Sequence, residues 1–345
     1  MGFKIRIRQC DNPIDVEMGE TILQAALRHG ISYPSGCQSG NCAACKSHLH
    51  DGEIEMSPFS EYALTDAERG AGMILACRAV PWSDGEVSWL AEDDVVTNPV
   101  RHIDCTVTGL QDLTHDIKGV SLTPVDDKIP EFTPGQYASL SFAGLPGRDY
   151  SMASHATDPT IDFHIRAMPD GEVSAHVANT LAPGDPVRVE MPMGIAHIRS
   201  QHTGPVVLIA GGSGIAPIIS ILRAILAQDD TADRPIHLYL GVRDEADVYL
   251  EDYFADLAAQ HENLTVTWAL SEPGGDTARR TGHLASLLQL DLVRHLPLDG
   301  WKAYLAGPPV MVETSMAVLE DFGISRDNCH ADAFFTAREL ADNVA

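Results

Sequence analysis

The sequence predicts a multidomain protein that combines an α+β domain, an antiparallel β-barrel and an α/β domain. The length of 345 residues exceeds what one hydrophobic core usually serves. The hydrophobic pattern also changes along the chain, and it divides the sequence into residues 1–92, 100–201 and 204–345. An acidic stretch at 92–94, followed by Asn98 and Pro99, is expected to be the linker after the first domain.

The first segment alternates apolar and charged residues at positions 3–8, which is a strand pattern. Residues 21–29 place apolar side chains at helical spacing, and Gly30 follows as a signal for a helix end. We expect further strands at 14–16, 46–50 and 87–89. This mixture of elements indicates an α+β domain.

Four cysteines of the first segment have an informative spacing. Cys37, Cys42, Cys45 and Cys77 are separated by four, two and thirty-one residues, which is the ligand pattern of a plant-type [2Fe-2S] cluster. Structural zinc is the alternative, but zinc sites usually draw their cysteines in two close pairs. A Rieske centre is excluded, because the sequence has no Cys-x-His pair to supply its histidine ligands.

The residues around these cysteines carry a family resemblance. Residues 33–37 read Tyr-Pro-Ser-Gly-Cys, and residues 75–78 read Leu-Ala-Cys-Arg. Here the chain resembles plant-type ferredoxin domains, which implies a β-grasp fold with the four cysteines as cluster ligands. Gln38 and Asn41 depart from the usual loop sequence, and that bears on the reduction potential rather than on ligation.

The second segment, residues 100–201, is a run of short strands separated by turns, as in an antiparallel barrel. Residues 148–151 read Arg-Asp-Tyr-Ser. A tyrosine there can stack on an isoalloxazine ring, the hydroxyl can lie near flavin N5, and the guanidinium can bind phosphate. Residues 171–174 read Gly-Glu-Val-Ser and open a short helix expected at 174–181, whose N-terminus suits a pyrophosphate.

These two motifs, in this order, resemble the flavin barrel of the ferredoxin–NADP reductase superfamily; a plain barrel with surface turns is the alternative. The resemblance implies that FAD is bound and that Tyr150 and Ser151 act in catalysis. FAD is favoured over FMN, because relatives with FMN usually carry their ferredoxin domain at the other end. The implied flavin residues are Arg148, Tyr150 and Ser151, with Ile165 and Arg166 beside the ring and Gly171, Val173 and Ser174 at the phosphates.

The third segment, residues 204–345, alternates short apolar strands with helices, which predicts a parallel sheet with helices on both faces. Its first strand, 206–210, leads into a glycine loop and a helix start. Glycines let a pyrophosphate approach closely, and the helix N-terminus adds donors. The pattern is not G-x-G-x-x-G, but the same superfamily carries this G-G-x-G-x-x-P form, here Gly211, Gly212, Gly214 and Pro217.

Carboxylates after the second strand of this segment indicate NADH. Asp244 and Glu245 can accept from a ribose 2′-hydroxyl and would repel a 2′-phosphate, although Arg243 keeps NADPH possible. Gly307 and Pro308 match the nicotinamide loop of the superfamily. Many relatives carry cysteine where this chain has alanine at position 306. If that cysteine assists hydride transfer, its absence should slow the step or shift its barrier, not abolish it.

The C-terminal tail resembles the tails of reductases of aromatic ring-hydroxylating dioxygenases, in which Phe334 or Phe335 would cover the flavin; both could equally be core residues. The order of the three segments looks like the reductases of Rieske dioxygenases of the naphthalene and salicylate type. The resemblance implies electron transfer from NADH through FAD and [2Fe-2S] to a Rieske-type oxygenase or Rieske ferredoxin.

Other functions are compatible with the same motifs. One is a reductase of a di-iron hydroxylase of phenol, methane or alkenes, or of a sugar-deoxygenation system. Others are a non-enzymatic electron carrier that has lost its flavin and a flavin reductase that needs no cluster. Cluster removal would separate the last of these from the main hypothesis.

Charge and cysteine usage limit the partners and the compartment. The net charge is 23 − 49 = −26, which disfavours nucleic acid and anionic membranes as partners. The apolar stretch 205–222 is interrupted by glycines and a proline, so it does not predict a membrane span. Seven cysteines make an odd and clustered set, which favours a cytoplasmic protein.

Overall fold

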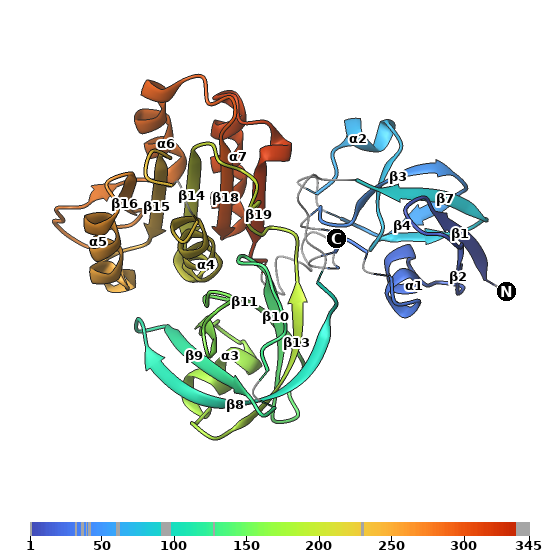
Figure 1. The fold of residues 1–345 in the computed structure, drawn as a ribbon, viewed down its shortest axis with the longest axis horizontal. Helices are drawn as coiled ribbons and strands as arrows, with labels where there is room; N and C mark the ends of the chain where they lie inside the picture. The colour runs from blue at the N-terminus through green and yellow to red at the C-terminus, as the bar shows by residue number, and fades with distance from the viewer. Residues whose placement is uncertain are drawn as a thin grey trace. The chain divides into compact units, whose positions relative to one another are not determined.

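The computed structural model describes residues 2–31, 33–35, 38, 40, 43–59, 63–90, 98–126, 128–228 and 231–335. The chain forms two compact units (Figure 1). The first comprises the residues up to Pro99, residues 193–195 and the chain from Phe335 onward; the second comprises Val100–Pro192 and Ala196–Phe334. Within the described residues, no helix is long and apolar enough to cross a membrane.

The first unit contains a five-stranded sheet of order β2-β1-β7-β3-β5 and a separate β4-β6 pair. Parallel pairing of β1 with β7, between antiparallel neighbours, gives the β-grasp arrangement expected from the ferredoxin resemblance. Its elements are β1 (Phe3–Ile7), β2 (Ile14–Val16), α1 (Ile22–Arg28), β3 (Lys46–Asp51), β4 (Ile54–Met56), α2 (Asp66–Gly70), β5 (Met73–Leu75), β6 (Ala79–Pro81) and β7 (Gly85–Trp89).

A capping box at Thr21 and Gln24 marks the start of helix α1, within the range 21–29 that the sequence predicts. Thr21 Oγ1 accepts a hydrogen bond from the Gln24 backbone N–H, and the Gln24 side chain accepts one from the Thr21 N–H. The buried face of α1 then joins the core that β1 and β7 line. Helix α2 and strands β4, β5 and β6 were not predicted from the sequence.

The second unit begins with a six-stranded sheet of order β11-β10-β13-β8-β9-β12. An antiparallel bridge between Met152 and Phe163 connects its two end strands, so the sheet curls toward the expected barrel. Helix α3 spans Glu172–Asn179, two residues earlier than predicted. The strands are β8 (Arg101–Asp112), β9 (Ile117–Pro124), β10 (Tyr137–Phe142), β11 (Arg148–Ser151), β12 (Ile161–Arg166) and β13 (Pro186–Met193).

A parallel sheet of order β17-β16-β15-β14-β18-β19 completes the second unit. All six residues of β14 are buried, which explains their continuous apolar run. The elements are β14 (Val206–Gly211), α4 (Ile215–Leu226), β15 (Ile236–Val242), α5 (Glu251–Gln260), β16 (Leu264–Leu270), β17 (Arg280–Thr281), α6 (Leu284–Leu292), β18 (Lys302–Gly307), α7 (Pro309–Asp321) and β19 (Cys329–Ala333).

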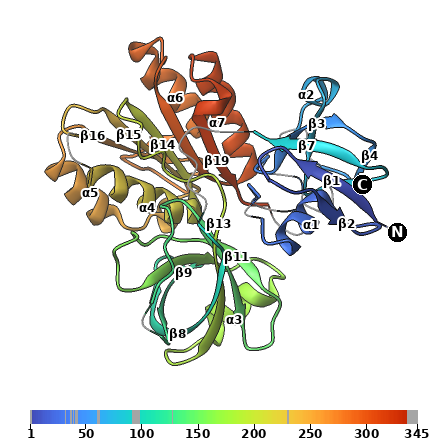
Figure 2. The same ribbon diagram turned by 45° about the vertical axis from the view of Figure 1, so that its right-hand side comes forward.

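Helices cover both faces of this sheet, as predicted (Figures 1 and 2). Helices α4 and α5 share one hydrophobic core with β14 and β15. On the other face, α6 packs on β15, where Leu284 contacts the strand at Gly241, and α6 contacts α7. Strands β17 and β19 were not predicted and extend the sheet at its two edges.

The barrel and the parallel sheet are joined by one continuous core. Ile117, Ala153 and Ile198 of the barrel segment belong to the same buried cluster as the α4 side chains. Ser220 Oγ, on α4, also donates a hydrogen bond of 2.7 Å to the Ser154 carbonyl. The two sheets are therefore packed as one body, which fixes the geometry of a site between them.

Candidate functional site

A cavity of about 530 Å³ lies at the carboxyl ends of the parallel strands. Among its lining residues, Gly211 ends β14, Gly241 is the last but one residue of β15, and Pro308 follows β18. Strand β14 lies between β15 and β18, so the strand order reverses here. Ligands of open parallel sheets bind at this kind of topological switch point.

Glycines bring the ends of β14 and β18 into close contact. A Cβ atom at Gly214 would lie 2.1 Å from the Ala306 carbonyl oxygen, and one at Gly307 would lie 2.8 Å from the Gly211 oxygen. A Cβ at Gly211 would lie 2.8 Å from Pro308 Cδ. The predicted nucleotide residues therefore form one tight backbone loop before α4, where N–H groups can meet a pyrophosphate. Pro217 is buried in the first turn of α4.

Arg166 reaches from the barrel into the same cavity. Gly212 has a φ of +55°, and a Cβ there would lie 3.0 Å from Arg166 Nη1, so the guanidinium lies against the glycine loop. Arg166 Nε is buried and makes no hydrogen bond within the described residues, although Asp116 Oδ2 is 3.3 Å away. A cationic group with a free donor beside a glycine loop fits the phosphates of a dinucleotide.

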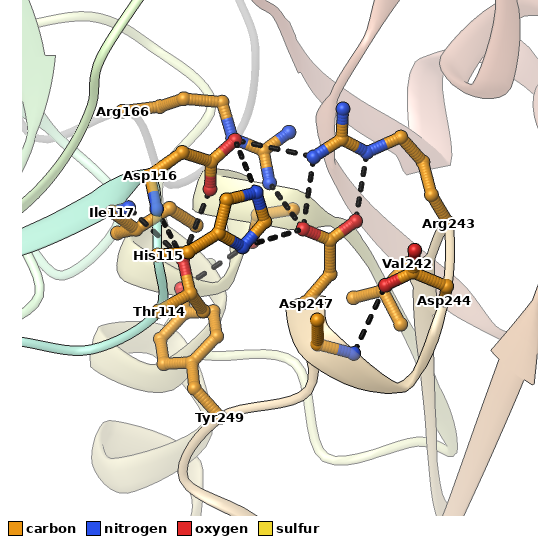
Figure 3. A network of polar contacts seen from close by, with 12 residues as sticks. Thr114, His115, Asp116, Ile117, Arg166, Val242, Arg243, Asp244, Asp247 and Tyr249 are labelled. Atoms are coloured by element: carbon orange, nitrogen blue, oxygen red, sulfur yellow. Dashed lines mark hydrogen bonds and ion pairs between the residues drawn. The ribbon is translucent and has the colours of Figure 1, made fainter. Parts of the chain in front are cut away.

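An ion-pair network surrounds this end of the cavity (Figure 3). Arg243 Nε and Nη2 donate to both oxygens of Asp247 at 2.7 and 2.9 Å, and Nη2 also donates to Asp116 at 3.1 Å. Arg166 Nη2 is 3.9 Å from Asp247, and the His115 ring nitrogens lie within 4.0 Å of both carboxylates. Asp247 is only 1% exposed, so the guanidinium groups of Arg166 and Arg243 lie beside a buried charge.

The carboxylates proposed for the ribose lie outside the residues that line this cavity. Asp244 Oδ1 accepts from the Ala246 N–H and caps the short helix η2 (Glu245–Asp247). Glu245 is paired with Arg279 at 2.8 Å. Arg243 and Asp247 line the cavity instead.

The flavin motif lies on β11, the end strand of the barrel sheet. Arg148 is exposed and Tyr150 is half-buried, and burial raises the pKa of Tyr150 to about 12, which keeps its phenol neutral. Ser151 Oγ donates a hydrogen bond of 2.9 Å to Asp332 Oδ2 on β19. This bond ties the flavin motif to the edge of the parallel sheet.

The second flavin motif is built around the start of α3. Gly171 is the N-cap residue, and Ser174 Oγ accepts from the Met168 N–H at 3.0 Å and donates to the Gly171 carbonyl at 3.1 Å. Val173 and Ile165 are buried in the barrel core. These hydrogen bonds fix the first turn of α3, and Gly171 has no side chain at the helix N-terminus where a pyrophosphate would bind.

The C-terminal aromatics belong to different units. The Phe334 N–H donates to the Gly307 carbonyl at 2.9 Å, and its half-buried ring packs on the core of the second unit. Phe335 is half-buried and belongs to the first unit.

Two of the four predicted cluster ligands, Cys45 and Cys77, are among the described residues; Cys37 and Cys42 lie outside them. Cys45 and Cys77 are 4% and 6% exposed. The Cys77 N–H donates to Cys45 Sγ at 3.4 Å, and Ala43 has a φ of +61° in the loop between the ligands. Buried sulfurs that accept backbone N–H bonds fit an iron–sulfur cluster.

Sequence reasoning missed the acidic residues Asp116, Asp247 and Asp332. Asp116 follows a turn of the barrel and Asp332 lies on the unpredicted β19, so no local pattern pointed to either. Asp247 had one signal, because it lies four residues after Arg243, the spacing at which side chains meet on a helical turn.

Comparisons with known proteins agree with these sites. Three family models match the chain: a 2Fe-2S iron-sulfur cluster binding domain over residues 7–81, an oxidoreductase FAD-binding domain over 104–198, and an oxidoreductase NAD-binding domain over 208–316. These domains bind the cluster, FAD and NAD, and their combination fits an electron path from NADH through FAD to the cluster.

Relatives match along nearly the whole chain. The reductase component of the naphthalene 1,2-dioxygenase/salicylate 5-hydroxylase systems of Ralstonia sp. is 37% identical, covering 93% of this chain and 95% of its own. The naphthalene 1,2-dioxygenase reductase component of Pseudomonas putida is 35% identical, covering 96% and 99%. The phenol 2-monooxygenase reductase component of Pseudomonas sp. (strain CF600) is 33% identical, covering 99% and 97%.

Solved structures show the same architecture. An Amycolatopsis cytochrome P450 reductase has a TM-score of 0.79 at 33% identity, with coverage of 97% of this chain and 99% of its own. The ferredoxin reductase in carbazole 1,9a-dioxygenase has a TM-score of 0.70 at 27% identity, with the same coverage. The chain is therefore an NADH-dependent oxidoreductase with FAD and [2Fe-2S], and it belongs to the family of reductase components of ring-hydroxylating dioxygenase systems of the naphthalene/salicylate type.

Proposed function

We propose that this reductase delivers electrons from NADH to a Rieske-type oxygenase, or to its Rieske ferredoxin, in aromatic ring hydroxylation. The full-length similarity to the two naphthalene dioxygenase reductases carries the proposal. A cytoplasmic location is proposed with it, because seven cysteines in an odd and clustered set suit a reducing compartment.

Each segment has a role in this proposal. Between the nucleotide and the cluster, bound FAD supplies the conversion of one two-electron hydride into single electrons, which an iron–sulfur cluster accepts one at a time. The glycine loop and Arg166 would hold the phosphates of NADH, and Gly307 and Pro308 would lie at the nicotinamide. Cys45 and Cys77, with Cys37 and Cys42, would hold the cluster from which electrons leave.

Ser151 and Tyr150 would position the flavin ring. Tyr150 stays neutral and half-buried, so its ring can stack on the flavin. The Ser151 hydroxyl is oriented by Asp332, whose Oδ2 accepts its hydrogen bond at an oxygen–oxygen distance of 2.9 Å. A hydroxyl fixed in this way can act where charge redistributes as hydride arrives.

Replacing Ser151 with alanine is expected to slow flavin reduction by NADH at least about tenfold, roughly 1.4 kcal/mol, while FAD stays bound. Stopped-flow absorbance of the flavin band measures the rate. Asp332→Asn keeps the shape of the acceptor and should slow the step less. Reduction at the wild-type rate in both variants would show that the Ser151 hydroxyl does not act on the flavin.

A di-iron hydroxylase is the second candidate partner. The phenol 2-monooxygenase reductase and a propane 2-monooxygenase reductase of Rhodococcus jostii are both 33% identical to this chain, so similarity favours the dioxygenase systems only modestly.

Reconstitution with purified partners tests the proposed function. With NADH in excess, the protein should reduce a Rieske ferredoxin or Rieske oxygenase at least about tenfold faster than a di-iron hydroxylase. The reduction rate should fall with added salt, because a chain of net charge −26 would be attracted to a cationic partner surface. Faster reduction of the di-iron hydroxylase would reverse the assignment of the partner.

A further inference from the structure

Arg243 is the cation that would be expected to bind a 2′-phosphate, because it follows β15 and lines the cavity. Its guanidinium is already committed to two carboxylates. Nε and Nη2 donate three hydrogen bonds, two to Asp247 and one to Asp116 (Figure 3). A phosphate would have to compete with both carboxylates for the edge of the guanidinium that binds oxyanions best.

The charges of this cluster cancel. Arg166 and Arg243 supply two positive charges, and Asp116 and Asp247 supply two negative ones. Burial opposes ionisation of Asp247, but hydrogen bonds and attraction from Arg243, with Arg166, hold its pKa below the usual range, so it is charged at neutral pH. A dianionic 2′-phosphate would therefore meet a neutral cluster rather than a cationic pocket.

The contacts of this cluster argue against two alternatives, which are a metal site and nucleotide specificity set by neighbouring carboxylates. His115, Asp116 and Asp247 have ligand atoms within 4.8 Å of one another, as a metal site would, but both carboxylates are paired with guanidinium groups that repel a cation. Asp244 and Glu245 could instead set the nucleotide specificity, but their carboxylates already have partners. The Asp244 carboxylate caps η2, and the Glu245 carboxylate pairs with Arg279.

We propose that Asp247, assisted by Asp116, makes the enzyme selective for NADH by holding Arg243 away from a 2′-phosphate. The inference rests on the proposed binding of the nucleotide in this cavity. Asp247 and Asp116 are positioning residues that act through Arg243, and loss of either carboxylate charge leaves the cluster with one net positive charge. That change creates a site for the 2′-phosphate.

Equilibrium binding of two nucleotide fragments tests the proposal on the full-length protein with FAD and cluster bound. Titration calorimetry should show that the wild type prefers 5′-ADP to 2′,5′-ADP. Asp247→Asn should shift the ratio of the two affinities toward 2′,5′-ADP at least about tenfold, since a charge-assisted hydrogen bond becomes available to the phosphate. Asp116→Asn should shift it less, because Asp247 still holds Arg243 by two bonds.

A second substitution locates the effect on Arg243. Adding Arg243→Gln to Asp247→Asn should abolish the gain for 2′,5′-ADP. The ratio of kcat/KM for NADPH to that for NADH should follow the binding ratio in each variant. If Asp247→Asn does not retain FAD, Asp116→Asn takes its place in the test, because the Asp116 side chain is more exposed. A shift of its affinity ratio toward 2′,5′-ADP then supports the proposal, and an unchanged ratio overturns it.

The outcomes distinguish this inference from the proposed function. Wild-type binding of 5′-ADP with an unchanged ratio in both aspartate variants would overturn the inference and leave the function intact. A gain from Asp244→Asn or Glu245→Gln, without one from Asp247→Asn, would assign specificity to those carboxylates and overturn it as well. No binding of 5′-ADP and no NADH oxidation by the wild type would overturn both proposals.

Discussion

Replacing Cys77 with serine is expected to lower NADH-dependent reduction of cytochrome c or a Rieske protein at least about a hundredfold, roughly 2.7 kcal/mol. Ferricyanide reduction should remain, because ferricyanide can take electrons from the flavin directly. The reason is that Cys77 is a buried member of the predicted ligand set, and its own N–H donates to Cys45 Sγ. Iron content and the [2Fe-2S] electron paramagnetic resonance signal should decrease together with the rate at which the protein acceptors are reduced.

Cys10→Ser is the matched control, since Cys10 is a half-buried cysteine of the same unit outside the ligand pattern. It should retain iron and reduce both kinds of acceptor at wild-type rates. Stoichiometric zinc in the wild type, without the [2Fe-2S] signal, would refute the cluster assignment itself.

A chain that begins at Asn98 separates loss of the cluster from misfolding of the first unit. The core of that unit and the two cores of the second unit share no residue, so the flavin and nucleotide sites should form without it. The shortened chain should keep FAD and reduce ferricyanide, but it should no longer reduce cytochrome c or a Rieske protein. Reduction of a Rieske partner at the full rate would mean that electrons do not leave through the cluster.

The sequence predicts the fold well where the signal is local. The apolar run of β14 and the Thr21–Gln24 capping box of α1 are each formed by residues that lie close together in the sequence. Helix α2 also had a local signal, because Thr65 and Glu68 form a capping box, but five residues are too few for a helical periodicity. Strand β19 forms at the open edge of β18, and nothing within its five residues indicates that edge.

The site follows the same division. Motifs of consecutive residues, such as the glycine loop, can be recognised in the sequence, because the backbone of that short segment binds the ligand. Pairs formed by tertiary packing are not. Ser151 and Asp332 are 181 residues apart, and Arg243 meets Asp116 across 127 residues. The choice between Asp247 and its neighbours as the cavity carboxylate depends on where η2 turns, which residue types alone do not determine.

Gly214 offers the most direct test of the nucleotide loop. Its φ of −60° and ψ of −10° are helical values that alanine adopts without strain, so any effect of Gly214→Ala comes from the added methyl group. That methyl would lie 2.1 Å from the carbonyl oxygen of Ala306. Ala306 is buried and paired with Ala210, so this backbone can yield only by separating β14 from β18.

Gly214→Ala is therefore expected to destabilise the second unit by about 2–3 kcal/mol, as overpacking of a rigid site does. For a unit of this size, the melting temperature should fall by roughly 4–12 °C, measured by the fluorescence of released FAD. The kcat/KM for NADH with ferricyanide should fall at least about tenfold, because the glycine loop and Pro308 are pushed apart. Gly275→Ala is the matched control, since nothing lies within 4 Å of its added methyl group. If both variants melt and turn over alike, the close approach of the two loops does not hold the nucleotide site together.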